Sequence, residues 1–550
     1  MNRDEYDTKM QLMVGDEETY ERLIRDPTNV TLKRINSIID KWYNEGYIEK
    51  AQKAKLKLFN CNPPRVYGLP KTHKEGRPLR IIVSTIGTAT YRMAKYLSSV
   101  LNNVVGKTPH HIVNSFQFVI DIRNQKIQPD TILFSLDVVS LFTNVPVDFA
   151  LQCIDQRWNE IEDHTSIEKS SFMEMLKVVL ESTFFQYNGS FYKQTFGIPM
   201  GSPLSPVVAN IVLERIEQAA LEELQQRGIK PIFFRRYVDD CLMGAKAEQV
   251  EEILSVFNGF HPRMQFTVET ETDGQLKFLD TIMRRSNENI STEWFPKDPD
   301  SRYLDFKSVS PYCHKKNTVI ALVDRALKLT DANLRQKTLG TVKTMLENNH
   351  YPSFLVENII KQRLHKMYNT LEGQNQPTSK QYVTIPYING LGEKLAKYLK
   401  QYNIDVAYKP IDKIKDILFT KTKDKISKDK NTNVVYEIGC SQCQKSYIGE
   451  TSQFLQKRIE QHKYTIKTKT VGGTGLAQHT FETGHIFKFD KAKILDKITN
   501  YNTRIIAETF HIKSRGDENV VNKQRDSITF KAAYNPIIRK LEREKAKKKM

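Results

Sequence analysis

The sequence predicts an α+β protein built from several domains. Its 550 residues, 39% of them hydrophobic, suffice for three or four domains with cores of their own. Strand-like apolar runs and segments with helical periodicity both recur along the chain, which predicts a mixture of strands and helices. Residues 373–379, Gly-Gln-Asn-Gln-Pro-Thr-Ser, are the clearest linker candidate and divide a larger N-terminal part from a smaller C-terminal part.

The balance of charge points to a polyanionic partner. Lysine and arginine number 83 against 64 for aspartate and glutamate, a formal charge of +19. Nucleic acid is the first expectation, although ribosome-associated and membrane-surface proteins are basic as well. Six cysteines are too few for a disulfide framework. No signal peptide and no run of membrane-spanning length is evident, so we expect a soluble, intracellular protein in a reducing compartment.

The first part of the chain predicts a helical segment followed by a basic hairpin. Residues 19–49 carry apolar side chains at helical spacing, and residues 63–83 read as two short strands around a loop with glycine and proline. Lys71 and Arg80 could lie on these facing strands and point the same way. Two fixed cations suit a triphosphate, although a solvated basic face is the alternative. A further helix is expected at about residues 89–105.

Three aspartates stand where strands end or turn. Asp137 ends an apolar run, and Asp239 and Asp240 lie at the tip of a hairpin expected from residues 231–234 and 241–244. Adjacent carboxylates repel each other unless a cation lies between them. Three carboxylates from neighbouring strands can hold two Mg²⁺ ions for in-line phosphoryl transfer. The alternative is an acidic turn beside an ordinary strand-terminating aspartate.

The segment between these aspartates predicts a helix, a hairpin and a loop. Residues 169–181 are amphipathic, and residues 184–194 read as a hairpin with an Asn-Gly turn. Residues 195–206 then form a loop rich in glycine and proline, which opens a helix through Glu223. A loop without large side chains lets the backbone approach a base pair or a nucleotide closely.

Four motifs along the chain resemble the fingers and palm of reverse transcriptases. In their detailed residues they resemble the reverse transcriptases of Penelope-like retroelements, which are relatives of telomerase. They read Leu-Pro-Lys with Arg-Pro-Leu-Arg, Ser-Leu-Asp-Val-Val-Ser-Leu-Phe-Thr-Asn-Val-Pro, Gly-Ile-Pro-Met-Gly-Ser-Pro-Leu-Ser-Pro, and Tyr-Val-Asp-Asp. The resemblance implies a right-hand polymerase with fingers, palm and thumb. It implies Mg²⁺ (or Mn²⁺) ligands at Asp137, Asp239 and Asp240, with Asp240 the least direct.

The same resemblance implies how the nucleotide is held. Lys71 and Arg80 would contact the triphosphate. Phe142 would lie under the sugar, where an aromatic ring clashes with a ribose 2′-OH, so that the substrate is a dNTP. The nascent base-pair pocket would be lined by Gly201, Ser202 and Pro203.

The region after the Asp-Asp pair is expected to hold the primer and template. Residues 266–271 and 276–282 read as antiparallel strands, and the second resembles a primer grip. Residues 302–316 are a basic loop with interleaved aromatics, which suits a nucleic-acid backbone. Amphipathic helices at residues 318–349 and 356–371 would form the thumb.

The C-terminal part predicts a second unit. A strand at residues 383–387, a helix at 392–402 and a strand at 406–408 come first, and the Ile-Pro-Tyr within them resembles a mark of the linker in Penelope-like proteins. The Lys-rich residues 421–430 are expected to be exposed. Paired strands at residues 433–438 and 445–451 are followed by a helix that carries Leu455, Arg458, Ile459 and His462.

This second unit resembles a GIY-YIG endonuclease, although its first motif reads Val434-Val435-Tyr436 without Gly-Ile. The resemblance implies that Tyr436 and Tyr447 orient or deprotonate water, that Arg458 holds the scissile phosphate and that Glu508 carries a divalent metal. Asn522 would support the site. The alternatives are core packing for the tyrosines and a solvated helix face for Glu508.

A zinc site is expected within the same unit. Cys440 and Cys443 form a Cys-x-x-Cys knuckle, which in a reducing compartment favours Zn²⁺ over a disulfide. His479 and His485 are the candidates for the other two ligands, with His462 as a spare, and the family resemblance includes such a Cys-Cys-His-His finger. We expect a structural ion; a free cysteine pair is the alternative.

The sequence thus predicts five regions: fingers and palm at 1–290, thumb at 291–372, a linker at 373–430, the endonuclease at 431–535 and a basic tail at 536–550. The expected function is target-primed reverse transcription of a Penelope-like retrotransposon in the nucleus. Partners would be template RNA, target DNA, their hybrid and dNTPs, with no membrane. The alternatives are a telomerase-like enzyme that extends existing 3′ ends and a domesticated nucleic-acid-binding protein.

Overall fold

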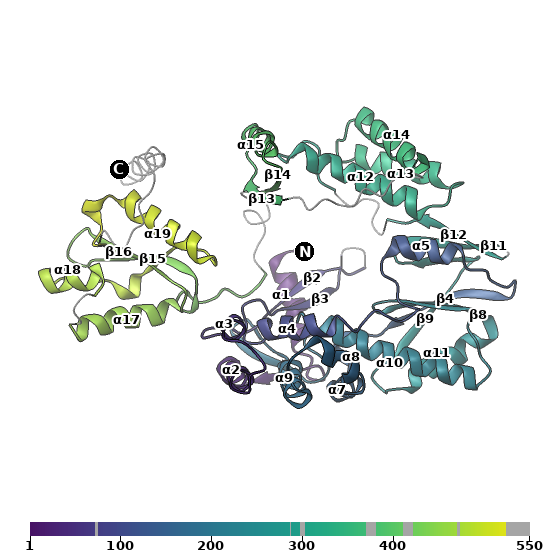
Figure 1. The fold of residues 1–550 in the computed structure, drawn as a ribbon, viewed down its shortest axis with the longest axis horizontal. Coiled ribbons are helices and arrows are strands. Elements are labelled where there is room, and N and C mark those ends of the chain that lie inside the picture. The colour runs from purple at the N-terminus through teal and green to yellow at the C-terminus, as the bar shows by residue number, and fades with distance from the viewer. Residues whose placement is uncertain are drawn as a thin grey trace. The chain divides into compact units, whose positions relative to one another are not determined.

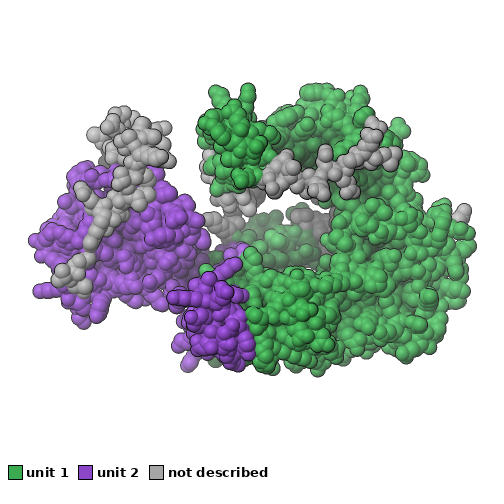
Figure 2. All heavy atoms as spheres, in the orientation of Figure 1, with its two compact units in different colours: residues 1–24, 65–84, 91–422 green, residues 25–64, 85–90, 423–550 purple. Residues whose placement is uncertain are grey.

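The computed structural model describes residues 1–71, 75–286, 288–296, 303–369, 381–410, 422–469 and 473–523. Two compact units divide it (Figure 2): one holds residues 1–24, 65–84 and 91–422, and the other residues 25–64, 85–90 and 423–550. The predicted linker at 373–379 and the basic tail lie outside the described residues. Among the helices that are described, none has the length and apolar character needed to cross a membrane.

A five-stranded sheet in the order β1-β6-β5-β2-β3 contains the predicted basic hairpin. Its strands are antiparallel apart from the β2–β5 pair. Asn188 and Gly189 both have positive φ at the β5–β6 turn, which confirms the predicted Asn-Gly hairpin. One face of the sheet packs against helix α1 (Arg3–Val14) through a shared apolar cluster. The strands are β1 (Tyr20–Leu23), β2 (Arg65–Pro70), β3 (Leu79–Ser84), β5 (Phe184–Tyr187) and β6 (Ser190–Gln194).

The predicted helix at residues 19–49 is wrong at its start. Residues 20–23 form strand β1, because Tyr20 is buried against Phe185 and the strand pairs with β6 at the edge of the sheet. The helix that follows, α2, spans Thr28–Asn44, and α3 spans Lys50–Leu56. Tertiary pairing therefore overrides the local helical periodicity at this end.

A four-stranded antiparallel sheet in the order β7-β8-β4-β9 carries the three aspartates. Its strands confirm the predicted strand at residues 131–137 and the predicted hairpin around the Asp-Asp pair. Helices α10 and α11 lie side by side along it (Figure 1). The strands are β4 (Thr131–Val138), β7 (Phe233–Tyr237), β8 (Asp240–Lys246) and β9 (Phe266–Thr270).

The helices around this sheet largely follow the prediction. The amphipathic segment is α9 (Lys169–Glu181), as expected, and the Gly/Pro loop opens α10. The helix expected at 89–105 is shorter, because the chain turns after Leu101. The helices are α4 (Tyr91–Leu101), α6 (Leu141–Asn144), α7 (Val147–Gln156), α8 (Trp158–Ile161), α10 (Ser205–Gln226) and α11 (Val250–Gly259).

A small sheet, β10-β11-β12, and four helices share the next core. The strand predicted at 276–282 is two strands, because Leu279 has a positive φ and turns the chain back on itself. Figure 1 shows α12, α13 and α14 grouped together. The elements are α5 (Ser115–Arg123), β10 (Gln275–Phe278), β11 (Thr281–Ser286), β12 (Asn289–Trp294), α12 (Tyr312–Leu329), α13 (Arg335–Glu347) and α14 (Ser353–Asn369).

The single helix predicted at residues 318–349 is divided into α12 and α13. Thr330 accepts a hydrogen bond from the backbone N–H of Trp294 (3.0 Å), and Asp331 accepts one from Thr292 (3.1 Å). Asp331 also pairs with Arg123. These side chains bind strand β12 instead of continuing the helix, which is the known competition of Thr and Asp with helical structure.

A parallel β-α-β unit comes next and confirms the prediction for residues 383–408. It consists of β13 (Gln381–Pro386), α15 (Leu391–Lys400) and β14 (Ile404–Lys409). The tyrosine of the Ile-Pro-Tyr motif has a structural contact here, because the Tyr387 hydroxyl donates to Glu393 (2.6 Å). Glu393 in turn accepts from the Gly390 N–H and caps α15.

The C-terminal module, residues 431–523, is a three-stranded antiparallel sheet with helices. The two predicted strands pair as expected, with Ile438 opposite Tyr447. A third strand joins β15 on its other edge. The elements are β15 (Val434–Gly439), β16 (Ser446–Thr451), α17 (Leu455–Lys467), α18 (Gly475–Thr483), β17 (Lys493–Lys497) and α19 (Tyr501–Arg515).

Candidate active sites

The three aspartates of the four-stranded sheet lie at one end of it. Asp137 on β4 stands directly opposite Asp240 on β8. Asp239 lies in the two-residue turn that joins β7 to β8. Asp137 is exposed and the other two are half-buried. Carboxylate oxygens at an accessible sheet end are the ligands that Mg²⁺ prefers, so the donor set fits a divalent ion.

The two predicted cations share one face of the five-stranded sheet. Arg80 pairs with Leu69 across β2 and β3, and the Lys71 N–H donates to the Pro78 carbonyl (2.9 Å), which continues the same register. Residues two apart on a strand point to the same side, so Lys71 lies on the face of Leu69 and hence of Arg80. Arg80 is exposed and Lys71 is half-buried. Both remain within reach of an anionic ligand on that face.

Two glycines press the predicted nucleotide loop against its neighbours. A Cβ at Gly201 would lie 2.0 Å from the Val83 carbonyl oxygen of β3, and one at Gly197 would lie 2.5 Å from the carbonyl of Phe142. Both glycines have positive φ, +73° and +82°. The loop therefore touches strand β3, which carries Arg80, and the short helix α6, which carries Phe142.

The remaining loop residues have unequal access. The Phe142 carbonyl accepts the Ile198 N–H (2.9 Å), and the Phe142 side chain is half-buried. Ser202 is 6% exposed, and its hydroxyl accepts the Leu204 N–H at the start of α10. Pro203 is half-buried. The Ser202 side chain thus serves the loop itself, and Gly201 and Pro203 present the accessible surface.

In the C-terminal module the two predicted tyrosines lie on one face of the sheet. Tyr436 on β15 stands opposite Gly449 on β16, and the rings of Tyr436 and Tyr447 are 6.4 Å apart. A Cβ at Gly449 would lie 2.7 Å from the Tyr436 hydroxyl and 2.8 Å from the Tyr447 ring. Only glycine at this position leaves room for both rings.

His462 joins this cluster instead of the zinc candidates. It lies on α17, is 2% exposed, and its Nε2 is 2.7 Å from the Tyr436 hydroxyl. Burial, together with the nearby Arg458 cation, lowers the pKa of His462 to about 3. The ring is therefore neutral at physiological pH and can accept the Tyr436 proton in a hydrogen bond. The sequence held one indication of this position: His462 follows Arg458 by four residues, so the two side chains lie on the same side of the helix.

The other predicted residues surround the tyrosines. Burial raises the pKa of Tyr436 well above its ordinary value; Tyr447 and Glu508 raise it further, and Arg458 opposes them. Burial alone would lower the pKa of Arg458, but both tyrosine hydroxyls raise it and the net change is upward. Glu508 on α19 is 8% exposed, so it does not lie on a solvated helix face.

Asn522 supports strand β16 from its edge. Its side-chain amide donates to the Ile448 carbonyl (2.7 Å), and its oxygen accepts the Ile448 N–H (3.0 Å). Ile448 lies between Tyr447 and Gly449, so this two-point contact fixes the backbone that carries one of the two tyrosines. Asn522 acts through the strand and not through the cluster itself.

The four predicted zinc ligands come together. Their ligand atoms all lie within 4.8 Å of one another: Cys440, Cys443, His479 and His485. The S–N distances are 3.6 Å for Cys440–His485 and 3.6 Å for Cys443–His479, and the two histidine nitrogens are 3.2 Å apart. Tetrahedral Zn²⁺, with bonds of about 2.3 Å to sulfur and about 2.05 Å to nitrogen, requires about 3.6 and 3.3 Å. The donor set therefore fits Zn²⁺.

The pKa of the Cys440 thiol is lowered. Burial raises the pKa of Cys440, but hydrogen bonds from the backbone of Gln442, Cys443 and Ser441 outweigh it and lower the pKa overall. No other group of three or more His, Cys, Asp or Glu side chains in the described ranges brings its donor atoms this close.

Comparison with known proteins bears on the first of these sites. Residues 70–271 match the family of reverse transcriptases (RNA-dependent DNA polymerases). Residues 302–361 match the animal helix-turn-helix domain. Over 190 residues the chain is 24% identical to a putative COX1/OXI3 intron 2 protein of Saccharomyces cerevisiae, a match that covers 34% of this chain and 21% of the yeast protein.

Two solved structures are also similar to part of this chain. Telomerase from Candida albicans, in complex with a fragment of telomeric RNA, shows 12% identity and a TM-score of 0.38, with 61% of this chain and 68% of that chain covered. The RNA-dependent RNA polymerase of a sicinivirus shows 12% identity and a TM-score of 0.34, with 62% and 74% covered.

The chain carries a reverse transcriptase domain. This domain, residues 70–271, contains every residue predicted for the polymerase site, from Lys71 to Asp240. The helices predicted to form a thumb are α12 to α14; the helix-turn-helix match covers α12, α13 and the first half of α14. The assignment of individual residues to metal, nucleotide or nucleic acid remains a prediction.

Proposed function

We propose that the reverse transcriptase domain synthesises DNA on an RNA template. The observation that carries the proposal is the register that sets Asp137 opposite Asp240 in a domain matched to RNA-dependent DNA polymerases. Asp137 and Asp239 would hold Mg²⁺ (or Mn²⁺), with Asp240 in a lesser role. When bound, the metal polarises the reacting phosphate and lowers the pKa of the primer 3′-OH.

The other residues of the domain bind and select the nucleotide. Lys71 and Arg80 hold the triphosphate on their shared sheet face, and Gly201 and Pro203 let the nascent base pair approach the backbone. Phe142 lies under the sugar and excludes a ribose 2′-OH. In the reaction the primer 3′-oxygen bonds to the α-phosphate, the bond to the bridging oxygen breaks and pyrophosphate leaves.

We propose that the C-terminal module is a GIY-YIG endonuclease that nicks DNA. The buried cluster of Tyr436, Tyr447, His462, Arg458 and Glu508 supports this reading. Arg458 binds the scissile phosphate and Glu508 would carry a divalent metal. Because the pKa of Tyr436 is raised, its hydroxyl keeps its proton, donates it in the hydrogen bond to His462 and leaves its oxygen to orient water. Zn²⁺ at Cys440, Cys443, His479 and His485 would hold the module together.

Together these activities support target-primed reverse transcription by a Penelope-like retrotransposon protein in the nucleus. The nuclease exposes a 3′-OH on target DNA, and the polymerase extends it along template RNA. The formal charge of +19 suits a protein that holds RNA, DNA and their hybrid. A telomerase-like enzyme that extends existing ends, or a domesticated nucleic-acid-binding protein, is the alternative.

A primer-extension assay separates these readings. We expect Mg²⁺-dependent dNTP incorporation on a primed RNA template, lost in Asp239→Ala. Absent incorporation by the wild-type chain would refute the polymerase. Nicking of supercoiled DNA, lost in Arg458→Ala but kept in Asp239→Ala, would establish the nuclease. If Arg458→Ala extends a supplied blunt or recessed 3′ end along RNA, the telomerase-like reading gains support.

A further inference from the structure

Arg236, the residue before Tyr237-Val238-Asp239-Asp240, is buried under the metal-binding turn. It lies on β7 and is 1% exposed. Its Nη1 donates to the Val238 carbonyl (3.0 Å) and to the Asn210 side chain (3.0 Å), and its Nε donates to Glu217 (2.9 Å). The Arg236 guanidinium thus links the Val238 carbonyl of the turn to two side chains of helix α10, Asn210 and Glu217.

The turn needs such support because its backbone is strained. Val238 has φ +56°, a conformation that β-branched residues rarely adopt. Its carbonyl is the group that Arg236 holds, and the next residue is Asp239. Strained backbone at functional sites persists only where surrounding contacts determine it. The Arg236 contact is therefore placed to set the direction of Asp239.

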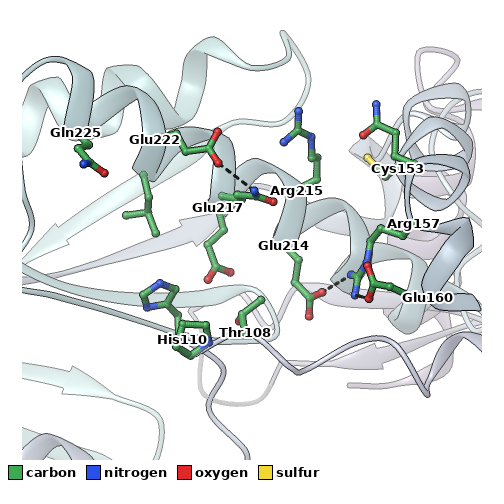
Figure 3. Close-up of a pocket in the computed structure, with 14 residues that line it drawn as sticks. Thr108, His110, Cys153, Arg157, Glu160, Glu214, Arg215, Glu217, Glu222 and Gln225 are labelled. Carbon is green, nitrogen blue, oxygen red and sulfur yellow. Dashed lines mark hydrogen bonds and ion pairs between the residues drawn. The ribbon is translucent and has the colours of Figure 1, made fainter.

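Helix α10 supplies the opposite charge. Glu217 is 3% exposed, and Glu214, 6% exposed, lies 3.8 Å from the guanidinium. Burial raises the pKa of Glu217, and Arg236 opposes this shift. Figure 3 shows Glu214 and Glu217 pointing from α10 towards the segment of Thr108 and His110. All four residues line a cavity of about 560 Å³.

The network extends away from the turn and anchors Arg236. Glu214 accepts the Gly106 N–H (2.7 Å) and a hydrogen bond from Arg157 (2.6 Å). The Arg236 N–H donates to the His110 carbonyl, and the Arg236 carbonyl accepts the Ile112 N–H, both at 2.8 Å. The backbone and the side chain of Arg236 are thus both fixed, and its bond to the Val238 carbonyl fixes the turn in the same way.

We infer that Arg236 is a positioning residue, which holds the Val238 carbonyl and thereby aims Asp239 and Asp240 at the metal. The inference rests on the proposed polymerase function. Lysine cannot replace arginine here, because a single ammonium on a flexible stem does not reproduce the planar fork that reaches Glu217 and Val238 together.

Three variants and a control test this. Arg236→Lys keeps the charge. The double variant Arg236→Met, Glu217→Gln removes the buried cation together with its partner charge, which avoids the destabilisation of an unpaired buried carboxylate. Arg236→Met alone shows that cost. Glu222→Gln is the matched control, because Glu222 lines the same cavity on α10 and bonds only to Gln218 among the contacts described.

Electron paramagnetic resonance of Mn²⁺ measures divalent-ion binding, and the signal lost in Asp239→Ala identifies the polymerase site. The melting temperature and the Mg²⁺ dependence of dNTP incorporation are measured for the same variants. We expect the double variant to melt close to wild type and to bind Mn²⁺ about tenfold more weakly, and its kcat to fall by about a hundredfold, since misplacement of about 1 Å costs that much. Arg236→Lys should show an intermediate Mn²⁺ affinity.

The outcomes separate cleanly. Wild-type Mn²⁺ affinity and Mg²⁺ dependence in a folded double variant would overturn the inference and leave Arg236 a buried charge partner only. If the double variant does not fold, Arg236→Lys decides: wild-type Mn²⁺ affinity in it overturns the inference, and weakened affinity at an unchanged melting temperature supports it. Weakened Mn²⁺ binding without dNTP incorporation by the wild type would support the positioning role while the proposed polymerase function fails.

Discussion

The Tyr436 hydroxyl lies 2.7 Å from Nε2 of His462, in the buried centre of the C-terminal module. This pairing removes His462 from the zinc candidates and gives Tyr436 a neutral hydrogen-bond acceptor. His462 follows Arg458 by one helical turn, so α17 presents the cation that we propose to bind phosphate and a neutral hydrogen-bond acceptor on the same side. The sheet supplies the tyrosines, and the helix supplies their partners.

Substitution His462→Phe is expected to lower the nicking rate by about a hundredfold, because the Tyr436 hydroxyl loses the acceptor that fixes its direction and a misplacement of about 1 Å costs about that much. Nicking of supercoiled plasmid by the intact chain measures it. RNA-templated dNTP incorporation should be unchanged. Tyr464→Phe is the control, since Tyr464 lies on the same helix and is 67% exposed. Nicking at the wild-type rate in His462→Phe would show that the pair only fills the core.

The same histidine makes the module sensitive to acid. Its pKa of about 3 in the folded chain lies below the value of about 6.5 in the unfolded chain. The unfolded state therefore binds the proton first, so the stability that neutral His462 provides is complete above about pH 6.5 and is lost as pH falls towards 3. Between pH 6.5 and 5 we expect a loss of about 2 kcal/mol.

Denaturant unfolding of the full chain, followed by a probe in the C-terminal module, measures this loss. In His462→Phe the group that titrates is absent, and the difference in unfolding free energy between the two pH values should shrink accordingly. An identical pH dependence in wild type and variant would mean that other groups govern the acid response.

Metal content tests the cysteine and histidine cluster. Cys440→Ser should bring zinc below one equivalent per chain and lower the melting temperature of the C-terminal module, because the binding free energy of a structural ion is also folding free energy. The polymerase should keep its activity. Cys313→Ser is the control, since Cys313 is exposed and lies outside the cluster. Equal zinc in Cys440→Ser and wild type, by elemental analysis, would refute the site.

The candidate sites could be predicted where their residues belong to short local motifs. Asp-Asp in a hairpin turn, Asp137 at a strand end and the Cys-x-x-Cys knuckle all follow from short-range pattern and turn chemistry. His462 was not assigned correctly, because a histidine near a cysteine knuckle is an equally good zinc ligand on sequence grounds. Only the packing of α17 on the sheet decides between the two roles.

The fold was mispredicted where long-range contacts decide. Thr330 and Asp331 interrupt a helical pattern because they bind β12, and the sequence around them does not indicate that partner. Residues 20–23 pair with β6, which lies about 170 residues away. The burial of Arg236 could not be predicted from the sequence, since it depends on carboxylates supplied by α10.

The close approach of the nucleotide loop to β3 predicts that Gly201 tolerates no side chain. Gly201→Ala would place a Cβ 2.0 Å from the Val83 carbonyl and displace the loop, so dNTP KM should rise by at least about tenfold. Gly228→Ala is the control for conformation alone, because Gly228 has φ +76° with no atom within 4 Å of a Cβ. That change should cost about 1 kcal/mol of stability and leave KM unaltered. Equal KM values in the two variants would mean that the loop is not at the nucleotide.

Phe142 should decide which sugar the polymerase accepts. Its half-buried ring follows Asp137 by five residues, and its backbone is fixed to the nucleotide loop through Ile198. Phe142→Ala removes the group that would meet a 2′-OH, so we expect the ratio of kcat/KM for dNTP over rNTP to fall by about a hundredfold or more, since exclusion by contact is worth several kcal/mol. Single-nucleotide incorporation with matched dNTP and rNTP measures the ratio. Phe142→Tyr keeps an aromatic ring at the same place and should retain selectivity. If both variants still exclude ribonucleotides to the wild-type degree, the sugar is selected by another residue and Phe142 serves the packing of the loop.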